Sequence, residues 1–143
     1  MTNEQLLEHA KKAREYANVD MSGFKVGAAL LLKSGKVYHG CNIEDPSGIG
    51  ITNVCAERCA IIKAISEGHT DFVKIATVGG PCSDPDSSCD KSSEGLRFCP
   101  PCGACRQYLN SWNPEIKVVL QDKEQIKEFA LSELLPFSFN EEF

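Results

Sequence analysis

The chain has 143 residues, of which 42% are hydrophobic and 24% charged, values that suit one soluble domain with its own core. A net charge of −5, with scattered lysines and arginines, argues against nucleic acid as a partner, because such binders usually carry a basic face. The sequence also has no apolar run of membrane-spanning length and no signal peptide. We therefore expect a single domain over residues 1–143, in the cytoplasm with reduced thiols, and no membrane partner.

The first half of the chain predicts a helix, a hairpin and a second helix. Residues 4–17 carry apolar side chains at helical spacing. Residues 24–43 hold two strand-like runs on either side of a Ser-Gly turn signal. The first run is almost entirely apolar, which predicts a strand in the middle of a sheet. Residues 55–68 predict a helix that ends at Gly68.

The second half alternates strands with helices. Residues 73–80 predict a short buried strand, and residues 81–99 a polar, turn-rich loop insertion. A helix from Cys102 to about Ser111, a strand at 116–120, and a last short strand and helix near 125–137 follow. This order predicts an α/β fold, a three-layer α/β/α sandwich around a mixed five-stranded sheet.

Three equally spaced cysteines lie in residues 98–107, FCPPCGACRQ. The two prolines cannot lie inside a helix, but a helix can begin directly after them. Cys102 and Cys105 then share one face of its first turn, whereas Cys99 lies upstream in extended chain. We predict that Cys102 and Cys105 are the metal-chelating pair.

The predicted third ligand is Cys55, which opens one helix as Cys102 opens another. Catalytic zinc sites typically have three protein ligands and a water, and the positive ends of helices favour thiolates. Glu57 would lie beside the metal without binding it, where a proton shuttle belongs. Arg58 is placed to donate hydrogen bonds to the thiolates and to offset their negative charge.

Several motifs together resemble the zinc-dependent nucleoside deaminases, specifically the small cytidine deaminases. The strongest are CAER at 55–58 and PCGACRQ at 101–107. FKVGAALL near the start, N-x-E at Asn42 and Glu44, and ELLPFSF near the end also resemble that family, so the resemblance spans about residues 5–139. A cysteine as first ligand is similar to the free-nucleoside branch rather than to the nucleic-acid editors.

The resemblance implies hydrolytic deamination of cytidine or deoxycytidine in pyrimidine salvage, with one Zn²⁺ per chain. It implies that Glu57 takes a proton from the zinc-bound water, delivers it to N3 of the ring, and then protonates the departing amino group. Gln107 matches a family position that supports the metal ligands from behind.

The resemblance also implies a substrate pocket and a homotetramer. Asn42 and Glu44 correspond to residues that bind the ribose hydroxyls, and Phe24 to one that packs on the nucleoside. The backbone around Ala56 corresponds to the part that reads the pyrimidine edge. Phe139 corresponds to an aromatic residue that closes a neighbouring subunit's pocket.

The chain departs from the family pattern in three places. The family commonly reads N-x-E-N-A-S-Y-G before C-A-E-R, whereas NIEDPSGIGITNVCAER is about two residues longer and lacks the tyrosine, which changes the fit at the sugar's 5′ side. Residues 20–22 read Asp-Met-Ser instead of Pro-Tyr-Ser.

The third departure is the insertion at 81–99, which carries Cys82, Cys89, Arg97 and Cys99 and is positioned to cover the active-site mouth. It has no nearby histidine and its cysteine spacings are irregular, so a surface loop with reduced thiols or one disulfide is favoured over a second metal site.

Three alternative functions stay open. The enzyme class includes deaminases of modified nucleosides, such as the blasticidin S type, which share the cysteine ligands. Alternatively, Cys59 or Cys99 completes a closed four-thiolate zinc site in a non-catalytic interaction module, which would leave Glu57 unexplained. A nucleic-acid editor is disfavoured by the acidic charge and the missing histidine ligand.

The other cysteines and the histidines have simpler expected roles. We expect Cys41 and Cys59 to be packed in the interior. We expect His9, His39 and His69 to be solvated, because none has a ligand partner in the sequence.

Overall fold

The computed structural model describes residues 1–82 and 93–140; Cys89 and the other residues at 83–92 of the predicted insertion lie outside this part. The sheet has the order β2-β1-β3-β4-β5, with β3 and β4 parallel and the other neighbours antiparallel. The strands are β1 (Phe24–Leu32), β2 (Val37–Cys41), β3 (Phe72–Pro81), β4 (Lys117–Asp122) and β5 (Gln125–Ala130). The helices are α1 (Asn3–Arg14), α2 (Ala56–Ser66), α3 (Gly103–Trp112) and α4 (Leu131–Leu134), with 3₁₀ turns η1 (Gly50–Thr52) and η2 (Ser93–Gly95).

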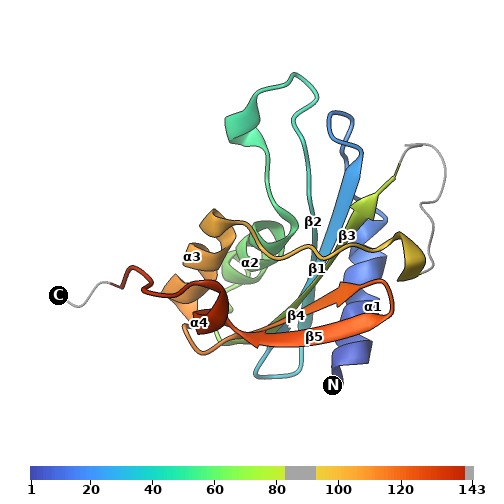
Figure 1. Cartoon of the computed structure of the whole chain (residues 1–143). Coiled ribbons are helices and arrows are strands. Elements are labelled where there is room, and N and C mark those ends of the chain that lie inside the picture. Colours follow the sequence, from blue (N-terminus) through green and yellow to red (C-terminus); the bar gives the residue numbers. More distant parts are fainter. Residues whose placement is uncertain (83–92, 141–143) are drawn as a thin grey trace.

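Helices cover both faces of this sheet. α1 lies on one face, and α2 and α3 lie on the other (Figure 1). Each face has its own buried cluster, around Leu6, Leu7 and Val119 under α1, and around Ile61, Leu109 and Leu120 under α2 and α3. The predicted α/β fold with a mixed five-stranded sheet is confirmed, including the central position of the apolar strand β1.

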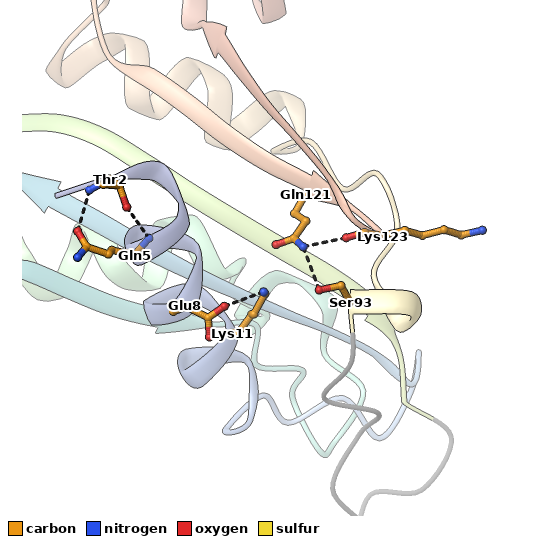
Figure 2. Close-up of polar contacts among 7 residues, drawn as sticks. All are labelled: Thr2, Gln5, Glu8, Lys11, Ser93, Gln121 and Lys123. Carbon is orange, nitrogen blue, oxygen red and sulfur yellow. Dashed lines mark hydrogen bonds and ion pairs between the residues drawn. The ribbon is translucent and has the colours of Figure 1, made fainter.

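Helix α1 begins with a capping box and lies directly on β1. Thr2 and Gln5 exchange hydrogen bonds of 2.9 and 3.1 Å between their backbones and side chains (Figure 2). A Cβ at Gly27 of β1 would meet the Ala10 carbonyl oxygen and lie 2.5 Å from the Arg14 amide nitrogen. Only glycine allows this contact between backbones, so α1 lies directly against β1.

A second glycine brings α2 equally close to β2. A Cβ at Gly40 would meet the Ala56 carbonyl oxygen, and it would lie 2.5 Å from the amide nitrogen of Ala60. Both Ala56 and Ala60 are fully buried. The first turn of α2 is thereby held against the sheet, and Cys55 immediately precedes it.

Two expectations about the β2 edge were wrong. Cys41 and Cys59 are half-buried rather than interior, and they line a pocket of about 240 Å³ with His39 and Lys63. They stay partly open because β2 is an edge strand, so no further strand covers this side. The Lys63 ammonium instead donates to the His39 carbonyl oxygen at 2.5 Å.

His9 and His39 are also not simply solvated. Nδ1 of His9 and Nε2 of His39 lie 2.9 Å apart, and their rings meet edge to face. The contact joins α1 to β2. It links residues 30 positions apart, which no local pattern reveals.

The end of the predicted insertion returns to the sheet. Arg97 donates its backbone N–H to Gly79 of β3 at 2.9 Å. The amide of Gln121 donates to Ser93 at 3.1 Å and to the Lys123 carbonyl at 2.8 Å (Figure 2). This path brings Cys99 to the end of β3.

Among the described helices, none combines the length and apolar character needed to cross a bilayer.

Candidate active site

Three cysteine sulfurs converge where α2 and α3 begin. Cys55 and Cys102 are the N-cap residues of the two helices, and Cys105 lies in the first turn of α3. All three Sγ atoms lie within 4.8 Å of one another, and Cys55 and Cys102 are 3.7 Å apart. The predicted trio is therefore assembled in the fold.

The spacing of these sulfurs fits a zinc ion. A tetrahedral site with zinc–sulfur bonds of about 2.3 Å holds its sulfurs about 3.8 Å apart. Within the described residues, the cluster includes neither Cys59 nor Cys99. Burial raises the pKa of the Cys99 thiol to about 12. Three thiolates with an open fourth position are the donor set of a catalytic site.

Charge in the cluster is concentrated on one sulfur. A hydrogen bond with Cys105, followed by those with Arg58 and Cys102, lowers the pKa of Cys55 to about 5 against the effect of burial. The same hydrogen bond to the Cys55 thiolate, and then burial, raises the pKa of Cys105. Arg58 Nη2 lies 3.8 Å from Cys55 Sγ and 3.4 Å from the Asn53 carbonyl oxygen, which fits its predicted role.

Glu57 lies beside the thiols on the buried side of α2. Only 3% of the residue is exposed, and burial raises the pKa of its carboxyl group, an effect that the nearby Cys55 charge reinforces. Thr77 of β3 is also buried, and its hydroxyl has no hydrogen-bond partner among the described residues. This hydroxyl lies near the Glu57 carboxyl and lowers the pKa of that group, against the effect of burial. Thr77 has no signal in the sequence, because a single threonine in a buried strand belongs to no motif.

Phe24 and Cys99 meet at the end of the sheet next to this centre. A Cβ at Gly79 would lie 2.7 Å from Cys99 Sγ and 2.9 Å from Phe24 Cε1. Cys99 is also close enough to Glu57 and Cys55 for their charges to raise its pKa further. The aromatic ring, the spare thiol and the buried carboxyl therefore line one region.

Asn42 contacts the start of β1, and Glu44 contacts the segment directly before it. The carboxamide of Asn42 accepts from Val26 N at 2.8 Å and donates to the Phe24 carbonyl at 2.9 Å. One carboxylate oxygen of Glu44 accepts from the backbone of Met21 at 3.1 Å and of Ser22 at 3.0 Å. Both side chains thus contact residues 21–26, and the other Glu44 oxygen makes no hydrogen bond to the described residues.

The extended segment before Cys55 forms a loop that is closed at its base. Ile43 and Val54 exchange two backbone hydrogen bonds of 3.0 Å each. The loop between them projects beyond the sheet (Figure 1). Ile51 within this loop is 93% exposed.

Asp45 ties this loop together from within. Its carboxylate accepts from the backbone and hydroxyl of Ser47 at 2.7 and 2.6 Å and from the Thr52 hydroxyl, and its N–H donates to Asn53 at 2.6 Å. These bonds, those from Ser47 and Thr52 first, lower the pKa of the Asp45 carboxyl. The loop is therefore held by its own residues.

The other predicted residues divide between the helix start and the tail. Ala56 is the first residue of α2, where backbone N–H groups lack intrahelical partners. The amide of Gln107 donates to the Phe139 carbonyl at 3.0 Å and to Ser111 at 3.5 Å, so it contacts the tail. The ring of Phe139 is 68% exposed.

Comparison with known proteins gives a consistent result. The family model described as "Cytidine and deoxycytidylate deaminase zinc-binding region" matches residues 1–121. A cytidine deaminase of Halalkalibacterium halodurans is 44% identical over 144 residues, which cover 99% of this chain and 97% of that protein. A blasticidin-S deaminase of Bacillus cereus is 34% identical over 114 residues, covering 80% and 76%. The crystal structure of a cytidine deaminase from Burkholderia pseudomallei superposes with a TM-score of 0.81 at 38% identity, covering 97% of this chain and all of that one.

Proposed function

Because the chain belongs to the cytidine and deoxycytidylate deaminase family, we propose that it catalyses the hydrolytic deamination of cytidine and deoxycytidine. Water replaces the 4-amino group, and the products are uridine or deoxyuridine and ammonia. The observation that carries this function is the three-thiol cluster with Glu57 buried beside it. Cys55, Cys102 and Cys105 hold the zinc ion, which when bound supplies the Lewis acid that makes water nucleophilic near neutral pH.

Glu57 moves the protons of the reaction. Its carboxylate takes a proton from the attacking water and delivers it to N3 of the pyrimidine, which makes C4 electrophilic. Glu57 then takes the remaining proton from the hydroxyl added at C4 and passes it to the amino group. The C4–N bond breaks, ammonia leaves, and the oxygen at C4 becomes the carbonyl of uridine. A raised pKa suits this double role, because the group must both accept and release a proton near neutral pH.

The residues around Glu57 bind and orient the nucleoside. Phe24 packs on the nucleoside, and the backbone around Ala56 reads the pyrimidine edge. Asn42 and the second carboxylate oxygen of Glu44 bind the ribose hydroxyls. In support, Asn42 contacts the start of β1, at which Phe24 lies, and Glu44 contacts the segment directly before it.

We further propose that the enzyme is a cytoplasmic homotetramer with shared pockets. The exposed ring of Phe139 closes the pocket of a neighbouring subunit, which its lack of cover within its own chain supports. Light scattering during gel filtration should give four times the mass of one chain. A monomer that turns over cytidine at full rate would overturn this assembly.

The proposed function is tested by the loss of cytidine absorbance with purified, zinc-loaded protein. We expect Glu57→Gln to lower kcat by about 10²- to 10⁴-fold while it retains zinc, since only the proton transfer is lost. Glu67→Gln, an exposed change at the other end of α2, is the matched control and should leave kcat unchanged. A wild-type protein that binds zinc but does not deaminate cytidine would contradict the proposal.

A deaminase of modified nucleosides is the second candidate, favoured by the longer loop before Cys55 and by the blasticidin-S deaminase relative. That relative is less similar to the chain and covers less of it than the cytidine deaminase does. Assays with cytidine and blasticidin S in competition separate the two. Preference for blasticidin S would make deamination of modified nucleosides the first candidate function.

A further inference from the structure

Side chains on α3 hold the last described part of the chain. Arg106 Nη1 donates to the Leu134 carbonyl at 2.7 Å. Asn110 Nδ2 donates to the Phe139 carbonyl at 3.2 Å and to Asn140 Oδ1 at 2.9 Å. Gln107 donates to the same Phe139 carbonyl at 3.0 Å. The helix that carries two of the metal thiols therefore also fixes the path of the tail.

These contacts combine a fixed backbone with an uncovered ring. Asn110 is only 6% exposed, so its hydrogen bonds are largely shielded from water. Phe137 has a left-handed φ of 53°, which a bulky residue adopts only where its surroundings impose it. The Phe139 ring nevertheless remains 68% exposed. The chain thus maintains one tail conformation without packing its aromatic ring.

We propose that Asn110 is a positioning residue for substrate binding, because it fixes the Phe139 carbonyl and thereby the direction of the Phe139 ring. The inference rests on the proposed function, in which this ring closes a neighbouring pocket. Gln107 contributes to the same contact from a more exposed position. Gln107 thus holds the tail as well, in addition to the position behind the metal ligands that its motif predicts.

The same helix connects the tail to the zinc ligands. Arg106 Nε donates to the Pro101 carbonyl at 2.7 Å, directly before Cys102, while its Nη1 binds Leu134. Helix α3 therefore contacts the segment before Cys102 through Arg106 and the tail through Asn110. A change at Asn110 frees the Phe139 segment while the Arg106 contacts keep the ligand loop in place.

The test compares two asparagines of similar chemistry. Asn113 caps the end of α3 and donates its amide to the Phe72 carbonyl at 2.7 Å, away from the tail. We expect Asn110→Ala to raise KM for cytidine roughly three- to tenfold, the equivalent of one neutral hydrogen bond, with kcat and zinc content unchanged. Asn113→Ala should lower the melting temperature and leave KM unchanged. Equal KM effects in the two variants would overturn the inference.

A double mutant identifies Phe139 as the residue through which Asn110 acts. Phe139→Ala should raise KM, and adding Asn110→Ala should change it no further. Additive effects would show that Asn110 acts elsewhere. Gln107→Ala should also raise KM, but by a smaller factor. If Asn110→Ala does not fold, Gln107→Ala takes its place in the comparison.

Hydrogen exchange tests the same contact without turnover. The amides of residues 137–140 should exchange faster in Asn110→Ala than in the wild type and in Asn113→Ala. Unchanged exchange would overturn the inference even in an active enzyme. If the wild type does not deaminate cytidine but the amides of residues 137–140 exchange as expected, the result would instead count against the proposed function.

Discussion

Helices α2 and α3 begin alike but in different surroundings. Each has a cysteine at its N-cap with extended backbone and no side-chain capping bond. The first residues of α2, Ala56 and Glu57, are buried, whereas Cys102 and Gly103 at the start of α3 are exposed. One start therefore lies in the core of the molecule and the other at its surface.

The difference separates two requirements of one reaction. A carboxyl group that moves protons near neutral pH needs a raised pKa, which burial at α2 provides. A site that admits a nucleoside needs access, which the exposed start of α3 leaves available. Two equivalent buried helix starts would favour a closed metal site, and two exposed ones would leave Glu57 with an ordinary pKa.

The largest loss of activity is expected from changes to the two N-cap cysteines, because α2 and α3 each supply a zinc ligand at this position. Cys55→Ser and Cys102→Ser should each abolish tight zinc binding and lower turnover by at least about a hundredfold, more than the loss of a residue that only supports a ligand. Atomic absorption after dialysis measures the metal, with Cys59→Ser as a control that keeps it. Retained zinc in Cys102→Ser alone would show that the exposed start is dispensable.

A smaller effect should separate the starts by their packing. Gly40→Ala places a methyl group against the backbone of α2 and should lower the free energy of unfolding by about 1–3 kcal/mol. Gly103→Ala has no atom within 4 Å of the new methyl group and should raise it by about 0.5 kcal/mol. Urea denaturation at constant zinc measures both. Equal losses would mean that α3 is as tightly packed as α2.

The smallest effect concerns the pH dependence of stability in metal-free, reduced protein. Burial raises the pKa of Glu57 above its ordinary value of 4.5, so the folded chain holds this proton more strongly than the unfolded one. The resulting stabilisation is complete below pH 4.5 and is lost as the pH rises through the folded pKa. Glu57→Gln has no titrating group at this position, so it should lose less unfolding free energy than the parent as the pH rises from 5 to 8. Parallel pH curves for the two proteins would contradict a raised pKa.

Much of the fold was predictable because its signals are local. The apolar run of β1, the Ser-Gly turn that follows it and the glycine that ends α2 each act within a few residues, and Gly35 and Gly68 both adopt the positive φ expected of them. The cysteine trio was predictable because N-cap positions follow from prolines and helix spacing. In each case neighbouring residues determine the geometry.

The contacts that were not predicted join distant segments. Neither the meeting of Cys99 and Phe24 over Gly79 nor the approach of Thr77 to Glu57 follows from spacing, because each depends on how strands and loops pack. The hydrogen bond from Gln107 to the tail is a contact of the same kind, because its acceptor lies 32 residues later in the chain.

The loop at residues 43–54 has a consequence for the evolution of this family. Two backbone hydrogen bonds close it at Ile43 and Val54, and Asp45 binds its interior. Its bonds to other segments are made near its two ends, by Glu44 and Asn53. Residues can therefore be inserted or deleted inside it without displacing β2 or α2. The surface of this loop is therefore free to diverge among relatives that keep the same fold, and the loop can be exchanged between them as a unit.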